Sequence, residues 1–171
     1  MNLLILSLSH FLHLLATVVW IGGIVIILAV ILPGAKAALA SSPAVGGLMK
    51  EVSRRFTPMA NVSILVLIVT GVIITHYDPN FKGALQFDNP WSVVMLLKHL
   101  LVALMITVHF YRGFVLNPRI ARLSSQAADA RVASTLSSQV AGLQKLSLNL
   151  VRANFAMGMI VLLLTGISTS L

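Results

Sequence analysis

The sequence alternates between long apolar stretches and short segments that carry most of its charge. The four apolar stretches lie at about residues 3–32, 57–76, 90–112 and 146–170. About 20 apolar residues in a helix are enough to cross the hydrocarbon core of a bilayer, so each stretch can span it. The pattern predicts an all-α integral membrane protein: a four-helix bundle that forms one transmembrane domain over residues 1–171.

Proline residues mark where these helices are expected to begin and end. They occur in the pairs Pro33-Gly34, Thr57-Pro58, Asn89-Pro90 and Asn117-Pro118. Proline lacks the backbone N–H that a helix interior needs but is tolerated in the first turn. The outer two pairs therefore predict helix ends, and the inner two predict helix starts capped by Thr57 and Asn89. The segment 119–145, rich in Ser, Ala and Gln, predicts an amphipathic surface helix before the last span, either separate from that span or continuous with it.

Composition agrees with a membrane protein and restricts its chemistry. Hydrophobic residues make up 58% of the chain and charged residues only 9%, whereas a soluble domain has about 25% charged residues. Cysteine is absent, which excludes disulfides, thiolate metal sites and iron–sulfur clusters. Any bound metal must therefore use histidine, methionine, carboxylate or backbone ligands.

The basic residues lie almost entirely on one side of the predicted membrane. Ten of the twelve fall between spans one and two, between spans three and four, or at the neighbouring span ends. These ten are Lys36, Lys50, Arg54, Arg55, Arg112, Arg119, Arg122, Arg131, Lys145 and Arg152. By the positive-inside rule this side is cytoplasmic, so the amphipathic segment lies there and both termini lie on the outer, periplasmic side of the inner (plasma) membrane. Charges that alternate with apolar spans also argue against nucleic-acid binding.

Histidines within the spans are the leading candidates for function, because ionisable residues inside a membrane are costly. His13 lies roughly 15 Å along the first span, and His99 lies roughly 12 Å past Trp91 in the third. Two imidazoles at similar depth on separate helices are suited to hold the iron of heme b between them. His10 and His76 form a shallower pair and are alternative ligands for the heme or for a second metal.

Two neighbours of His99 leave the identity of the metal open. Lys98 is placed to neutralise a heme propionate or to reach the outer interface. Met95 shares a helix face with His99 at i, i+4 spacing, and a thioether beside an imidazole favours Cu(I). Heme b, serving electron transfer or heme-linked redox chemistry with a quinone or a redox protein as partner, is the first prediction. Copper binding or transport is the alternative, and assembly into a homo-oligomer is left open.

Spans two and four share a short similarity. Residues 67–73 read LIVTGVI and residues 162–168 read LLLTGIS, in helices that run in the same direction. The similarity predicts that the first and second helix pairs are related by an internal repeat. Chance similarity between two stretches rich in Leu and Ile is the alternative.

Four stretches of the chain carry a family resemblance. They read HLLATVVWIGG, RRFTPMANVSILVLIVTG, LLKHLLVALM and VRANFAMGMIVLLLTG, one in each span. Together they resemble the membrane domain of the copper resistance protein D family. The resemblance implies that His13, Trp20, Gly22 and Lys98, which fall on its pattern, contribute to a copper or cofactor site. That family usually has Glu where this chain has Asn154, so any role of that acid is absent here.

The same chain is similar, more distantly, to the HemJ-type protoporphyrinogen oxidases, which are four-span heme b proteins. His13 followed by Trp20 matches their first span, and Lys98 with His109 matches their third. The Asn-Glu-x-Pro motif of their fourth span is not found after Arg152. This resemblance implies a third alternative, an oxidoreductase that acts on a porphyrinogen.

Overall fold

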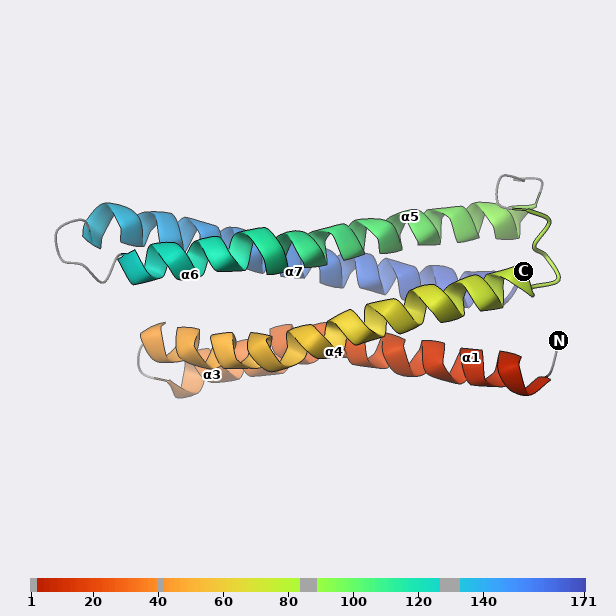
Figure 1. The fold of residues 1–171 in the computed structure, drawn as a ribbon, viewed down its shortest axis with the longest axis horizontal. Coiled ribbons are helices and arrows are strands. Elements are labelled where there is room, and N and C mark those ends of the chain that lie inside the picture. Colours follow the sequence, from red (N-terminus) through yellow and green to blue (C-terminus); the bar gives the residue numbers. More distant parts are fainter. Residues whose placement is uncertain (1–2, 40–41, 84–88, 127–132) are drawn as a thin grey trace. The chain divides into compact units, whose positions relative to one another are not determined.

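Helices make up almost all of the computed structural model, which describes residues 3–39, 42–83, 89–126 and 133–171. Four helices in this part are long and apolar enough to cross a membrane: Leu3–Ala38, Ala44–His76, Pro90–Gln126 and Leu136–Ser168. The described residues form no strand. The expected all-α fold class with four membrane-spanning helices is therefore confirmed. The chain divides into two compact units, residues 1–93 and 94–171, each built on one pair of helices (Figure 1).

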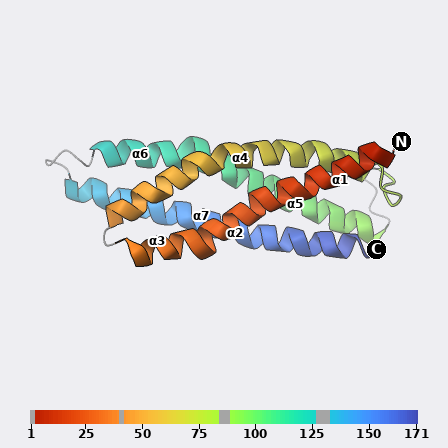
Figure 2. The same cartoon turned by 90° about the horizontal axis from the view of Figure 1, so that it is seen from below.

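The first unit pairs the first membrane helix with α4. The first helix is continuous through α1 (Leu3–Thr17), η1 (Val18–Gly22), α2 (Gly23–Ile26), η2 (Ile27–Ile31) and α3 (Leu32–Ala38), where η denotes a π-helical turn. It runs antiparallel to α4 (Ser42–His76), and the two lie side by side in both views (Figures 1 and 2). A Cβ atom at Gly23 would overlap the ring of Phe56 on α4. Glycine at this position therefore allows the two helices to approach closely.

The second unit pairs the third membrane helix with α7. The third helix is continuous through α5 (Pro90–Tyr111), η3 (Arg112–Leu116) and α6 (Asn117–Gln126), and α7 (Ala133–Ser168) runs antiparallel to it (Figure 1). The amide nitrogen of Asn154 on α7 donates to the carbonyl oxygen of Met105 on α5 at 3.2 Å, and both residues are buried. Polar contacts thus connect these helices at a depth where lipid offers no hydrogen-bond partner.

Two prolines that were expected to end helices lie inside continuous helices, so both predictions are wrong. Pro33 follows the π-helical turn Ile27–Ile31, and Pro118 follows the turn Arg112–Leu116. A π-helical turn widens the helix locally, which accommodates a ring that lacks an N–H and would meet the carbonyl four residues earlier. The proline stands two residues after the turn in both units, a shared register that agrees with the predicted internal repeat.

The two expected helix starts have opposite outcomes. The start at Thr57-Pro58 is wrong, because α4 begins at Ser42 and contains Pro58 in its interior. The Thr57 hydroxyl does not cap a helix but donates to the carbonyl of Ser53 at 2.7 Å. The start at Asn89 is confirmed, because its side-chain Oδ1 accepts a hydrogen bond of 2.7 Å from the backbone N–H of Ser92.

The membrane helices are much longer than a bilayer requires. α4 has 35 residues and α7 has 36, which at 1.5 Å per residue gives lengths of about 52 and 54 Å against a hydrocarbon core of about 30 Å. The extra helix length lies at the ends that carry the basic residues. Much of the segment between the predicted spans one and two therefore belongs to the ends of the two membrane helices, α3 and α4.

The segment expected to form an amphipathic surface helix is divided between two elements. Its first part is α6, in which Arg119 and Arg122 are exposed while Ile120 and Leu123 are partly buried. This apolar side packs against α7, so the predicted amphipathic character is confirmed. Its second part forms the beginning of α7. Arg131, one of the ten basic residues on the predicted cytoplasmic side, lies outside the described residues.

Candidate metal centre

His13 makes a hydrogen bond across the helix pair of the first unit. Its Nδ1 lies 2.8 Å from the hydroxyl oxygen of Thr70 on α4. The Thr70 hydroxyl has one proton, and it donates that proton to the carbonyl of Val66 at 2.6 Å. The Thr70 oxygen therefore accepts from His13, so Nδ1 of His13 carries the ring proton. A neutral imidazole in this tautomer has its lone pair on Nε2, which is the atom that can coordinate a metal.

The residue after Thr70 also lies beside the His13 ring. A Cβ atom at Gly71 would lie 3.5 Å from Cε1 of His13, an ordinary contact distance. On the other helix, the Thr17 hydroxyl donates to the backbone carbonyl of His13 at 2.8 Å. His13 is half-buried and Thr70 is buried. Thr70 thus supplies a hydrogen-bond acceptor for the imidazole ring, and Gly71 lies beside the same ring.

His99 has its ring oriented by its own helix. Its Nδ1 lies 2.6 Å from the backbone carbonyl of Met95, one turn earlier on α5. A carbonyl only accepts, so Nδ1 carries the proton and Nε2 carries the lone pair, as in His13. The side chain is exposed on its helix face. The two histidines predicted as the heme ligands belong to different units of the chain, and each is held in the tautomer suited to coordination through Nε2.

The other predicted ligands lie in different surroundings. His10 is exposed on α1, and His76 lies at the end of α4, where its ring meets Tyr77 edge-on at a centroid distance of 5.0 Å. Lys98 is partly buried on α5. Within the described residues, no three His, Asp or Glu side chains are grouped so that they can hold one metal ion.

The remaining predicted cofactor residues lie in the first helix at its first π-helical turn. Trp20 is 1% exposed, among the most completely buried side chains of the described residues. Gly22, the next predicted residue, would place a Cβ atom 4.0 Å from the nearest atom, a Cγ of Val18. Close packing is required at the following glycine, Gly23, and not at Gly22.

Sequence reasoning did not identify the partner of His13. The Thr-Gly pair at Thr70 was noted only as half of a repeat, and the depth of His13 was compared with that of His99. A signal was nevertheless present. A hydroxyl residue within an apolar stretch of the neighbouring antiparallel helix is a candidate acceptor for an imidazole N–H.

Comparison with known proteins adds a family assignment to this geometry. The family model described as copper resistance protein D matches residues 50–168. The match includes Thr70, Met95 and His99, whereas His13 lies before it. No curated protein and no solved structure matches the chain. Because the match covers more than half of the sequence and runs through three of the four membrane helices, the chain belongs to the copper resistance protein D family.

Proposed function

We propose that this protein binds copper within the membrane, either to sequester it or to move it across. The observation that carries the proposal is the family match over residues 50–168, which includes His99 and Met95. Copper is the cargo in this proposal. The supporting feature of the chain is its donor set, because without cysteine the soft and borderline ligands left to it are methionine and histidine.

Two positions suit a copper ion. The first is His13, whose Nδ1 is bonded to Thr70 at 2.8 Å. The second is His99, whose Nδ1 is bonded to a backbone carbonyl, with Met95 one turn away on the same face. Histidines that ligate metals almost always donate their other ring N–H to such a partner, which fixes the ring and makes Nε2 the ligand. We infer one copper contact in each unit.

The distribution of charge supports one orientation of the protein in its membrane. Basic residues concentrate at the ends where α3 meets α4 and where α6 meets α7, and these ends belong in the cytoplasm. Both termini then face the periplasm across the inner membrane. His13 and His99 would lie in the outer half of their spans, so copper would reach them from the periplasmic side.

Heme b is the second candidate function, because the same ring geometry suits iron. An imidazole held by an Nδ1 hydrogen bond is also a heme ligand, and heme b would supply one-electron redox chemistry in place of copper transfer. In that case His13 and His99 would be the candidate heme ligands, with His10 and His76 as alternates, and Lys98 would neutralise a propionate. A quinone or a redox protein would be the partner, and a homo-oligomer is a possible assembly.

The experiment that tests the proposal measures metal and colour on the same sample. The full chain is purified from copper-supplemented cells, copper per chain is measured by mass spectrometry, and the absorption spectrum is recorded before and after dithionite. We expect bound copper and no Soret band. His13→Ala and His99→Ala should each remove copper, whereas His109→Ala, with an imidazole next to a ring of Phe110, serves as the control. A Soret band that shifts on reduction would contradict the copper proposal and would show that the protein binds heme b.

A further inference from the structure

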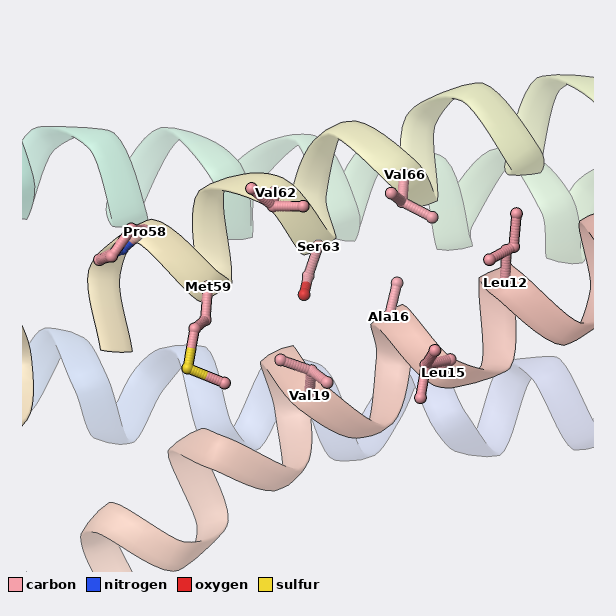
Figure 3. Close-up of a pocket in the computed structure, with 9 residues that line it drawn as sticks. All are labelled: Leu12, Leu15, Ala16, Val19, Pro58, Met59, Val62, Ser63 and Val66. Atoms are coloured by element: carbon pink, nitrogen blue, oxygen red, sulfur yellow. The ribbon is translucent and has the colours of Figure 1, made fainter. Parts of the chain in front are cut away.

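The first unit contains an apolar groove between α1 and α4. Its volume is about 450 Å³, within the range of roughly 300–1,000 Å³ typical of small-molecule sites. Figure 3 shows Ala16 and Val19 on the side of the first helix and Met59, Val62 and Ser63 on the side of α4. Ser63 contributes a hydroxyl to a lining that is otherwise hydrocarbon and thioether. No charged residue lines the groove.

The Ser63 hydroxyl points into this groove (Figure 3). The residue is 5% exposed, and its oxygen makes no hydrogen bond to any residue that the structure describes. Other hydroxyls in these helices bond the carbonyl one turn earlier. Thr57 bonds Ser53 at 2.7 Å, and Thr70 bonds Val66 at 2.6 Å. Ser63 differs from these neighbours on the same helix because its side chain faces the groove and not its own backbone.

An unpaired hydroxyl at this depth is free to bond a partner from outside the protein. Ser63 is thirteen residues before His76, which places it about 20 Å along the helix from the outer end. Lipid tails offer neither donor nor acceptor there, so the hydroxyl loses its hydrogen bonds to water without replacement. A ligand that fits the groove must be largely hydrocarbon, must carry an oxygen that can reach Ser63 and must be uncharged.

The depth of Ser63 distinguishes between the membrane components that could meet these conditions. The nearest basic residue on the same helix face is Arg55, about 12 Å away along the axis. The polar headgroup layer is only about 5–7 Å thick on each side of the core. The ester oxygens of a phospholipid held at Arg55 would therefore stop short of Ser63. A quinone, whose carbonyl oxygens belong to an uncharged ring, dissolves in the hydrocarbon at this depth.

We propose that the groove binds the head group of a membrane quinone, with the Ser63 hydroxyl donating to one of its carbonyl oxygens. The ring would lie against Ala16 and Val19, with its tail continuing into the lipid. Entry is lateral, because Val62 and Met59 at the rim are 62% and 53% exposed in the structure. The groove contains none of the residues proposed to contact copper, so this proposal can be tested independently of the copper proposal.

The experiment is a fluorescence titration of the full chain in detergent with a short-tailed ubiquinone analogue. Trp20 adjoins Val19 of the groove, and a bound quinone quenches nearby tryptophan. We expect saturable quenching, weakened about 5-fold by Ser63→Ala, the effect of one net hydrogen bond. Val62→Phe should abolish it by filling the groove. Thr107→Val is the matched control, because it removes a hydroxyl bonded only to its own helix, at 2.9 Å.

The same titration includes outcomes that would overturn the proposal. Quenching of Ser63→Ala that equals wild type would show that the hydroxyl does not recognise the ligand. Displacement of the quinone by a phospholipid, or equally well by an alkane of similar length, would make the groove a lipid contact. Circular dichroism checks that each variant is folded, and Ser63→Ala, which removes a single oxygen atom, keeps the test decisive if Val62→Phe does not fold.

Discussion

The hydrogen bond between Thr70 and His13 gives the most direct test of the candidate metal centre. Thr70→Val keeps the shape of the side chain but removes the oxygen that lies 2.8 Å from Nδ1 of His13. The imidazole is then half-buried with an N–H that has lost its acceptor. Leaving such a group unsatisfied costs about 1–3 kcal/mol. It also frees the ring to place its proton on Nε2, the atom proposed to coordinate copper.

A matched control exists in the second unit. Thr165 occupies the corresponding Thr-Gly pair in span four, and its hydroxyl bonds the carbonyl of Val161 at 2.8 Å, just as Thr70 bonds Val66. Thr165→Val therefore removes the same local bond without the contact to His13. The difference between the two variants isolates the interhelical hydrogen bond.

Two measurements report the outcome. In thermal or denaturant unfolding in detergent, we expect Thr70→Val to lose about 1–2 kcal/mol more than Thr165→Val. In competition with a chelator, its copper affinity should fall about 10-fold or more, as is usual when the hydrogen-bond partner of a ligating histidine is lost. Nitrogen NMR shifts of His13 test the tautomer without any metal. Equal behaviour of the two variants in all three measurements would refute the proposed role of Thr70.

Three further predictions concern packing, polarity and orientation. Gly23→Ala should destabilise the first unit by about 1–3 kcal/mol because its Cβ would overlap an aromatic ring, whereas Gly22→Ala should have little effect on the same unfolding curve. Asn154→Asp should unfold at lower temperature than Asn154→Leu, because both lose the donor to the Met105 carbonyl, bonded at 3.2 Å, but only aspartate buries a carboxyl group that faces this carbonyl. The chain has no cysteine, so Lys50→Cys should resist an impermeant maleimide on intact cells while Asn80→Cys is labelled. Labelling of Lys50→Cys but not of Asn80→Cys would show that the topology is the reverse of the one proposed.

Helix boundaries show why sequence rules for soluble proteins failed here. Pro33, Pro58 and Pro118 all lie within helices, although proline usually ends a helix in water. In a bilayer, a broken helix would leave several backbone groups without any hydrogen-bond partner. A local π-helical turn before Pro33 and before Pro118 costs less than ending the helix.

The sequence by itself determined the number of membrane helices and the side on which positive charge gathers. Both properties depend only on residues that are close together in the sequence. A run of apolar residues is sufficient for a span, whatever that span packs against. It also identified the histidines as candidates, because an imidazole within an apolar run is conspicuous. The cap at Asn89 was predictable for the same reason, since it depends only on the next three residues.

Tertiary structure alone decided which nitrogen of His13 carries the proton and what Ser63 faces. The acceptor for His13 is 57 residues away in the sequence, and the groove beside Ser63 exists only because two helices lie together at a particular register. Hydropathy cannot predict such contacts, because it describes the preference of each residue for an apolar or aqueous environment and not which residues it contacts. The chemistry proposed for this protein depends on that pairing of helices.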